Sequence, residues 1–191
     1  ALKAEGYATF FAGKWHLGKT PEHWPEKRGY DHNKGGHERG GPYGPGRYFT
    51  PYGNPRLEDG PEGEHLTERL GRETAEFIAA NADRPFFAFL SFYSVHTPLM
   101  APRELKVKYE AKAKDAGLDE LEAFAEEEQV WPNGKKRRVR TVQAHPTYAG
   151  MVESMDRALG VVLAALEAAG VADATLVAFF ADNGGPSTPD G

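Results

Sequence analysis

Two continuous apolar runs constrain the fold more than any other feature of this chain. Residues 86–93 read Phe-Phe-Ala-Phe-Leu-Ser-Phe-Tyr, and residues 174–181 read Ala-Thr-Leu-Val-Ala-Phe-Phe-Ala. A run that is apolar at nearly every position is typical of a strand covered on both faces, as in parallel sheets. A shorter β-prone run at 7–12 predicts a third strand. Because helical segments separate these runs, the sequence predicts an α/β fold whose mainly parallel sheet is flanked by helices.

Three helices are expected between or after these strands. Residues 64–81 place their apolar side chains close to one helical stripe, and residues 103–128 are strongly charged and also predict a helix. From Tyr148 onward, apolar residues keep helical spacing for about five turns until Gly170 closes the helix. Residues 2–5 read as the last turn of a further helix closed by Gly6, so we expect that preceding sequence has been lost.

Two segments lack a regular period. Glycine, proline, histidine and tyrosine crowd residues 21–61, which predicts a long loop on the active-site side. Its aromatic residues argue against disorder, and four of its basic residues are candidates to line a substrate cleft: His32, His37, Arg39 and Arg47. An Asn-Gly pair within residues 129–146 predicts a small hairpin-like excursion.

Polar motifs follow each of the three predicted strands. They are Lys14 with His16, then His96, then Asp182 with Asn183. In open α/β sheets, ligands bind in the crevice beyond the carboxyl ends of the strands. If the strands are parallel, the three motifs therefore share one edge of the sheet.

Each motif has a functional and a plain structural interpretation. Asp182 and Asn183 offer the hard oxygen ligands that Ca²⁺ or Mg²⁺ prefers, although Asp-Asn-Gly-Gly also suits a tight turn. Lys14 and His16 would point to the same side of an extended segment, where they could hold an anion and move a proton, or simply face solvent. His96 suits a general acid or an anion contact, or a structural hydrogen bond.

Composition narrows the classes of function. The formal charge of −5 gives no field that favours nucleic acid, and the basic run at 135–138 fits a solvated hairpin tip. No apolar run approaches the ~20 residues needed to cross a bilayer, so no membrane partner is expected. The absence of cysteine removes disulfides, thiolate ligands and thiol nucleophiles, and it leaves the compartment open.

Taken together, the motifs resemble those of the sulfatase family. Residues 6–18, Gly-Tyr-Ala-Thr-Phe-Phe-Ala-Gly-Lys-Trp-His-Leu-Gly, look like the family's second signature. Residues 95–98, Val-His-Thr-Pro, look like its histidine-proline segment, and residues 182–185, Asp-Asn-Gly-Gly, look like its distal metal motif. Their order and separations agree as well, and residues 48–92 look closest to bacterial sulfatases that act on sulfated saccharides.

The resemblance implies an alkaline-phosphatase-like fold, truncated at both ends, with residues 1–191 as a partial catalytic domain of a sulfuric ester hydrolase. It implies that Asp182 and Asn183 bind Ca²⁺, with Mg²⁺ as an alternative. It implies that Lys14 contacts the sulfate and the nucleophile, His16 serves the nucleophile's hydroxyl, and His96 binds sulfate or protonates the leaving alcohol. A sulfated small molecule or saccharide is the expected partner, in the periplasm or outside the cell.

One departure from the family pattern is severe. The resemblance implies a formylglycine nucleophile made from Cys or Ser in a Cys/Ser-x-Pro-x-Arg motif upstream of residue 13, and this chain has no such motif. We therefore expect the 191 residues alone to hydrolyse sulfate esters poorly or not at all. A phosphodiesterase or phosphonate hydrolase of the same superfamily, and a non-catalytic saccharide-binding domain, are the alternatives.

Overall fold

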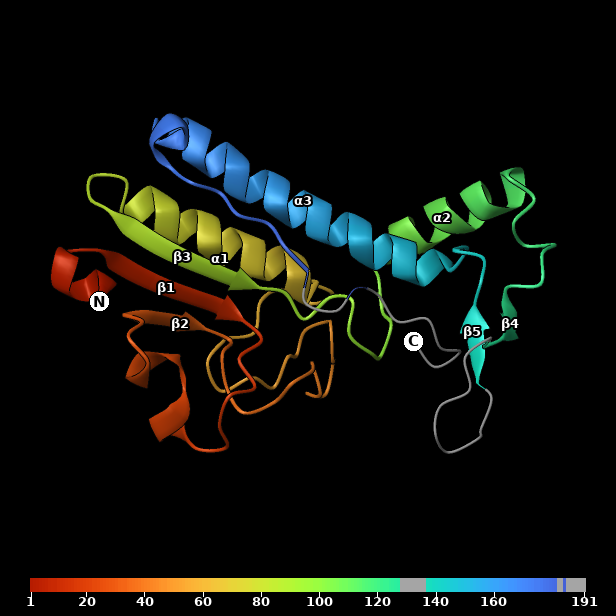
Figure 1. The fold of residues 1–191 in the computed structure, drawn as a ribbon, viewed down its shortest axis with the longest axis horizontal. Helices are drawn as coiled ribbons and strands as arrows, with labels where there is room; N and C mark the ends of the chain where they lie inside the picture. The colour runs from red at the N-terminus through yellow and green to blue at the C-terminus, as the bar shows by residue number, and fades with distance from the viewer. Residues whose placement is uncertain (128–136, 182–183, 185–191) are drawn as a thin grey trace. The chain divides into compact units, whose positions relative to one another are not determined.

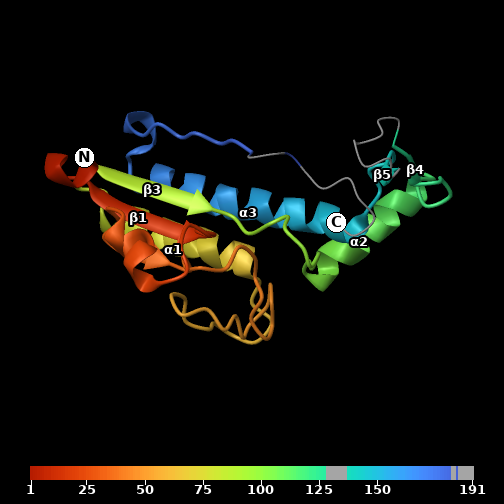
Figure 2. The same ribbon diagram turned by 60° about the horizontal axis from the view of Figure 1, so that its bottom comes forward.

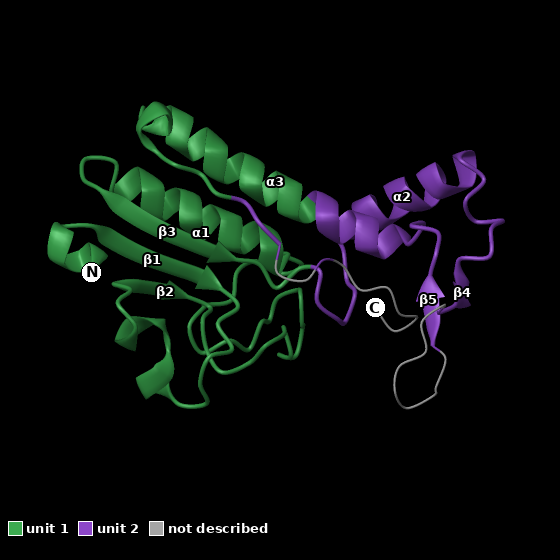
Figure 3. Ribbon diagram, viewed as in Figure 1, with its two compact units in different colours: residues 1–94, 154–178 green, residues 95–153, 179–191 purple. Residues whose placement is uncertain are grey.

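The computed structural model describes residues 1–127, 137–181 and 184, and the chain divides into two compact units (Figures 1 and 3). The first unit comprises residues 1–94 and 154–178, and the second comprises residues 95–153 and 179–191. Within the described residues, none of the helices has the length and apolar character needed to cross a bilayer. Each unit is described separately below.

A parallel three-stranded sheet forms the centre of the first unit. Its order is β2 (His32–Lys34), β1 (Ala8–Gly13) and β3 (Phe86–Ser91), with β1 in the middle. Both pairings of β1 are parallel, and Phe11 lies opposite Asn33 on one side and Phe89 on the other. The expected parallel α/β sheet is therefore confirmed.

Helix α1 (Leu66–Ala80) packs on one face of this sheet (Figure 2). The rings of Phe10 on β1 and Phe77 on α1 stack at 4.7 Å, and Phe86 on β3 meets Phe77 edge-on at 6.1 Å. Phe11 turns to the opposite face, because successive strand residues alternate sides, and there it packs against Trp15 and Tyr30. The expected helix at 64–81 is confirmed, and its apolar stripe is the face buried on the sheet.

Helix α3 (Pro146–Ala168) is the longest element, and its C-terminal part lies against α1 within the first unit. A Cβ added to Gly71 on α1 would come within 2.8 Å of the Cβ of Ala158 on α3, so the glycine permits the close approach of the two helices. Gly170 follows with φ of +69°, as expected for a residue that closes a helix. The 3-10 helix at Leu2–Glu5 ends in the same way at Gly6, with φ of +83°.

The second unit contains α2 (Arg103–Asp115), the N-terminal part of α3, and an antiparallel pair formed by β4 (Phe124–Glu126) and β5 (Arg138–Arg140). Helix α2 ends well before residue 128, so the prediction of a helix over 103–128 was too long. The reason is Gly117, which has φ of +65° and donates its N–H to the carbonyl of Lys114. The residues between 128 and 136, the tip of the expected hairpin, lie outside the described residues.

The prediction of a strand at 174–181 was wrong. Residues 172–174 form a 3-10 helix, and residues 175–181 form neither a strand nor a helix. Leu176 is 94% exposed and Phe180 is 73% exposed. An apolar run indicates that a segment favours burial, but a strand also needs a neighbouring strand to pair with. No strand in the described part of the chain pairs with this run.

The side chains of β3 are also less covered than predicted. Phe87 is 37% exposed, and the other residues of this strand are half-buried rather than enclosed on both faces. β3 occupies an edge of the described sheet, because its single partner there is β1. The apolar pattern predicted a strand enclosed on both faces. The structure instead places β3 half-buried at an edge of the described sheet.

Candidate functional site

The loop that leaves β1 is joined tightly to the end of β3. Gly13 has φ of +102°, and a Cβ there would come within 1.8 Å of the carbonyl oxygen of Ser91. The next residue, Lys14, donates its backbone N–H to that same oxygen at 2.8 Å. Only glycine fits this close approach of the two backbones. Gly13 therefore determines the backbone position of Lys14, the predicted anion contact.

Trp15 anchors the loop from its other side. Its Nε1–H donates to the carbonyl of His23 at 2.9 Å, and its ring meets Phe11 edge-on at 5.1 Å. Gly18 lies directly over His23, since a Cβ at this position would come within 2.2 Å of the Cβ of His23. The aromatic residue between Lys14 and His16 is therefore a structural anchor.

His16 adopts the left-handed backbone conformation, with φ of +55°. This conformation is uncommon for a residue with a side chain and often marks a functional position. The simple alternation expected for an extended segment at 14–16 therefore does not hold. The His16 side chain is exposed, and its backbone N–H donates to the carbonyl of His37 at 3.2 Å.

Gly40 makes room for the His16 imidazole. A Cβ added to Gly40 would come within 2.4 Å of Nδ1 and 2.5 Å of Cε1 of His16. The segment 37–40 therefore contacts His16 in two ways. The carbonyl of His37 accepts its backbone N–H, and its ring occupies the space that a side chain at position 40 would fill. This pairing of two distant segments was not predicted from the sequence, and only the clustering of glycines at 35–41 hinted at it.

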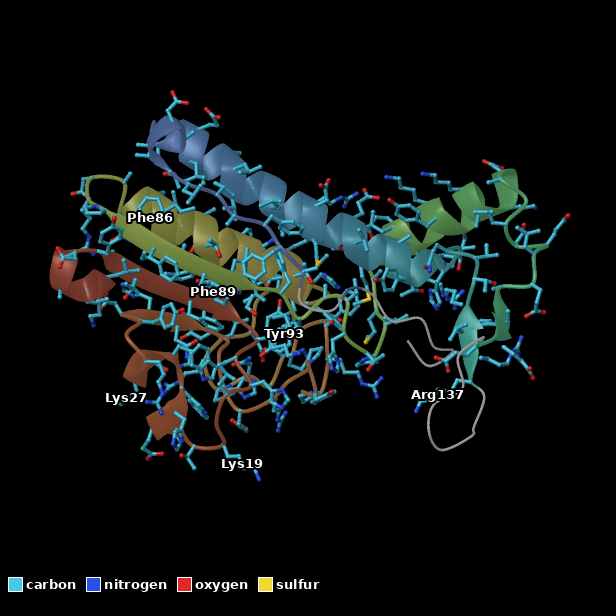
Figure 4. All side chains as sticks on the ribbon, viewed as in Figure 1. Lys19, Lys27, Phe86, Phe89, Tyr93 and Arg137 are labelled. Carbon is cyan, nitrogen blue, oxygen red and sulfur yellow. The ribbon has the colours of Figure 1, made fainter. Side chains whose placement is uncertain are left out.

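The segment that supports His16 is itself held from two directions. The carbonyl of Gly35 accepts hydrogen bonds from the Tyr93 hydroxyl at 3.1 Å and from Asn54 Nδ2 at 3.0 Å. The N–H of Gly35 donates to the carbonyl of Arg56 at 3.0 Å. Tyr93 lies just beyond the end of β3, past Phe89 (Figure 4), and its burial raises the pKa of its phenol, so the hydroxyl stays protonated as a donor.

His37 is the buried histidine of this region, with an exposure of 3%. Burial lowers the pKa of its imidazole, although the neighbouring carboxylate of Glu38 partly opposes this effect. Nδ1 of His37 lies 3.2 Å from that carboxylate, which can only accept, so Nδ1 carries the proton of this hydrogen bond. His37 is thus neutral and fixed in position. It belongs to the segment 37–40, the wall that contacts His16.

A hollow of about 530 Å³ opens between residues 37–39 and 53–59. Its lining side chains include His37, Glu38, Arg39, Glu58 and Asp59. Two of the four basic residues expected to line a cleft are therefore found there, while Arg47 lines an adjoining small recess with His37 and Arg39. His32 is elsewhere, on β2 with its ring 5.8 Å from that of Phe77.

His96 belongs to the second unit and is half-buried. Its Nδ1 lies 2.7 Å from the carbonyl oxygen of Thr97. Because a carbonyl can only accept, Nδ1 carries the proton, and the ring orientation is set by the neighbouring residue.

The predicted metal ligands Asp182 and Asn183 lie outside the described residues. Across 1–127, 137–181 and 184, no three histidine or acidic residues are grouped so that they could hold a metal ion. The described side chains therefore do not provide a calcium site. The proposed sharing of one sheet edge by all three motifs stays a prediction.

An α/β sheet with polar residues following its parallel strands defines a class of proteins that bind ligands at the carboxyl ends of those strands. The family model named Sulfatase matches residues 1–191, so this chain belongs to the sulfatase family. The expected family and the alkaline-phosphatase-like α/β fold are thereby confirmed.

Individual relatives agree with this assignment. The arylsulfatase of Klebsiella aerogenes is 31% identical over 96% of this chain and 46% of its own length, and the N-acetylgalactosamine-6-sulfatase of Canis lupus familiaris is 27% identical over 96% of the chain and 31% of its own. The crystal structure of Ps i-CgsB in complex with k-i-k-neocarrahexaose superposes with a TM-score of 0.59 at 28% identity, covering 88% of this chain and 36% of that one. The chain thus spans less than half of the length of these relatives.

Proposed function

We propose that the protein hydrolyses sulfate esters, and that these esters are carried by saccharides. The family assignment supports the reaction class, and a structural relative in complex with a neocarrahexaose supports a sulfated saccharide as the substrate. The observation that carries the proposal in this chain is the loop after β1, in which Lys14 follows a crossing that only glycine fits and His16 lies in the gap at Gly40.

Each candidate side chain has a role that suits this reaction. The Lys14 ammonium, a compact positive charge, would contact the sulfate oxygens as negative charge grows on them. His16 would exchange a proton with the hydroxyl of the nucleophile, and its left-handed backbone and the gap at Gly40 would hold the imidazole in place. His96 would protonate the leaving alcohol through Nε2, since Nδ1 is engaged by Thr97.

A calcium ion and a formylglycine nucleophile complete the proposal, because members of this family generally use both. Asp182 and Asn183 are the residues of this chain proposed to bind the ion, which would neutralise charge on the sulfate when bound. The nucleophile is not supplied by the 191 residues, which contain neither cysteine nor a Ser-x-Pro-x-Arg motif. A periplasmic or extracellular location is part of the same proposal.

The proposal is tested by comparing matched esters. The complete gene product is incubated with 4-nitrophenyl sulfate, with the diester bis(4-nitrophenyl) phosphate and with 4-nitrophenyl phenylphosphonate, and release of the nitrophenol is followed. A kcat/KM that is highest for the sulfate supports the sulfatase, whereas a higher value for the diester or the phosphonate favours the phosphodiesterase or phosphonate hydrolase. Absence of turnover on all three esters, with retained saccharide binding, favours the non-catalytic domain.

A further inference from the structure

The hollow between residues 37–39 and 53–59 is continuous with the wall that supports His16. The carbonyl of His37, a residue that lines the hollow, accepts the His16 N–H at 3.2 Å. Three residues further on, Gly40 borders the His16 ring. The hollow therefore shares His37 with the segment that contacts His16, the residue proposed to serve the nucleophile, and its volume of about 530 Å³ has room for a sugar ring.

The charge of the lining indicates what kind of group fits. Glu38, Glu58 and Asp59 contribute three carboxylates, whereas Arg39 contributes the single guanidinium, and His37 is kept neutral by burial. The lining therefore carries an excess of negative charge. A second sulfate or a uronate placed here would meet like charges, which disfavours its binding.

Some of these polar atoms are already engaged and others are open to a ligand. Asp59 accepts the backbone N–H of Tyr52 through Oδ1 at 2.6 Å, and Glu38 accepts from His37 through Oε2 at 3.2 Å. Each carboxylate keeps a second oxygen, and Glu58 is exposed at the rim. Carboxylate oxygens accept hydrogen bonds from hydroxyl groups in short, strong contacts, so this lining suits a ligand rich in hydroxyl donors.

Arg39 adds hydrogen-bond donors to the lining of the hollow, and the net charge of the lining stays negative. Arg39 donates through Nη1 to the carbonyl of Tyr43 at 3.3 Å and keeps further N–H groups that can donate to a ring or hydroxyl oxygen. A metal ion is not the favoured occupant, because the described acidic and histidine residues here do not form a group that could hold one. A neutral, polyhydroxylated ligand uses both the acceptors and the donor.

We propose that this hollow is a specificity subsite for an uncharged sugar ring adjacent to the sulfated sugar, and that it rejects a second anionic group at that position. The inference rests on the proposed sulfatase activity for its place in the reaction. It goes beyond that activity by assigning a preference among sulfated saccharides to Glu38, Glu58 and Asp59. Specificity of this kind arises as much from repulsion of the wrong ligand as from attraction of the right one.

The test uses the complete gene product and two disaccharides, one carrying a single sulfate on its terminal sugar and the other carrying a second sulfate on the neighbouring ring. The expected kcat/KM is about 10-fold or more higher for the monosulfated compound, since like-charge contacts of this kind are unfavourable by more than 1.4 kcal/mol. Glu58→Lys is expected to reduce that preference by about 10-fold, while Glu62→Lys, which reverses an exposed charge outside the lining, leaves it unchanged. Turnover of 4-nitrophenyl sulfate, which has no second ring, is expected to be the same in Glu62→Lys as in the wild-type protein.

An equal or reversed preference in the wild-type protein overturns the subsite, and so does an unchanged preference in Glu58→Lys. A binding measurement separates this result from failure of the proposed function. A neutral disaccharide without sulfate is expected to shift the backbone amide signals of Gly53 and Leu57 in heteronuclear NMR spectra. If those signals move while no sulfate ester is cleaved, the subsite is supported and the proposed reaction is wrong; if they do not move, the subsite is wrong.

Discussion

The imidazole of His16 lies against the Cα of Gly40, so closely that a methyl group at position 40 would come within 2.4 Å of Nδ1. Gly40→Ala is therefore expected to displace the ring of His16. Because that ring is exposed and can move, we expect unfolding free energy to change by less than ~1 kcal/mol. We expect sulfate ester turnover to fall by about 10-fold or more, since misplacing a catalytic group by an ångström is costly.

The control for this prediction is Gly160→Ala, on the exposed side of α3, where an added Cβ meets nothing within 4 Å. This substitution is expected to raise the unfolding free energy by about 0.5–1 kcal/mol and to leave turnover unchanged. Unfolding in urea and steady-state kinetics measure the two effects. Full activity of Gly40→Ala would show that the contact does not position His16.

Gly13 and Gly29 provide a matched pair that separates backbone strain from steric overlap. Their φ angles are +102° and +101°, but a Cβ on Gly13 would come within 1.8 Å of Ser91 O, whereas one on Gly29 meets nothing within 4 Å. Gly29→Ala is expected to cost about 1–2 kcal/mol of unfolding free energy from the left-handed conformation alone. Gly13→Ala is expected to cost at least ~2 kcal/mol more, because backbone atoms must move. Equal losses in urea unfolding would contradict the crossing of β1 and β3 described above.

Acid sensitivity is expected from Glu73 on α1. Burial raises the pKa of this carboxyl, but the hydrogen bonds from Lys34 and Arg69 outweigh burial, so its pKa lies below the usual value in the folded state. A depressed carboxyl pKa gives stability that is present above the unfolded-state pKa and is lost as pH falls through the folded-state pKa.

Glu73→Gln is therefore expected to lower the unfolding free energy at pH 7 by about 1–3 kcal/mol and to flatten its decline below about pH 4.5. Glu76→Gln, on the exposed side of the same helix, is the control and is expected to change little. Urea unfolding between pH 3 and pH 7 measures both variants; parallel pH profiles for wild type and Glu73→Gln would show that the ion pairs are not responsible.

The 191 residues are expected to be inactive when expressed by themselves. They contain no cysteine and no Ser-x-Pro-x-Arg motif, so they cannot supply the formylglycine that the family uses. The measurement is release of nitrophenol from 4-nitrophenyl sulfate by the purified 191-residue chain and by the complete gene product. Turnover by the 191-residue chain that is lost in His16→Ala would contradict this prediction.

The parts of the fold that the sequence predicted correctly are those determined by local patterns. The stripe of apolar residues over 64–81 and the spacing from Tyr148 to Gly170 each specify one buried face, and both segments are helices. The glycine that closes a helix is also a local signal, at Gly6 as at Gly170. The charged pattern over 103–128 was less informative, since a turn at Gly117 ended the helix early.

The features that were predicted wrongly or missed depend on contacts between residues far apart in the sequence. The apolar residues at 174–181 predict burial, but whether they form a strand depends on a neighbour that their own sequence does not encode. The contact between His16 and Gly40, and the hydrogen bond from Tyr93 to Gly35, join residues far apart in sequence. The motifs predict Lys14, His16 and His96 as site residues, whereas the wall that contacts His16 could be recognised only from the structure.

Hydrolysis of 4-nitrophenyl sulfate by the complete gene product, compared with its His16→Ala and Lys14→Ala variants, tests the central claim most directly. The account predicts turnover in the wild-type protein and a loss of about 10²-fold or more in kcat for His16→Ala, since placed proton-transfer groups contribute about 10²–10⁴ in rate. Lys14→Ala is expected to lower kcat/KM at an unchanged fold, as shown by an unaltered circular dichroism spectrum. Sulfate ester turnover that is unchanged in both variants would contradict the assignment of the loop after β1 as the catalytic loop of a sulfatase.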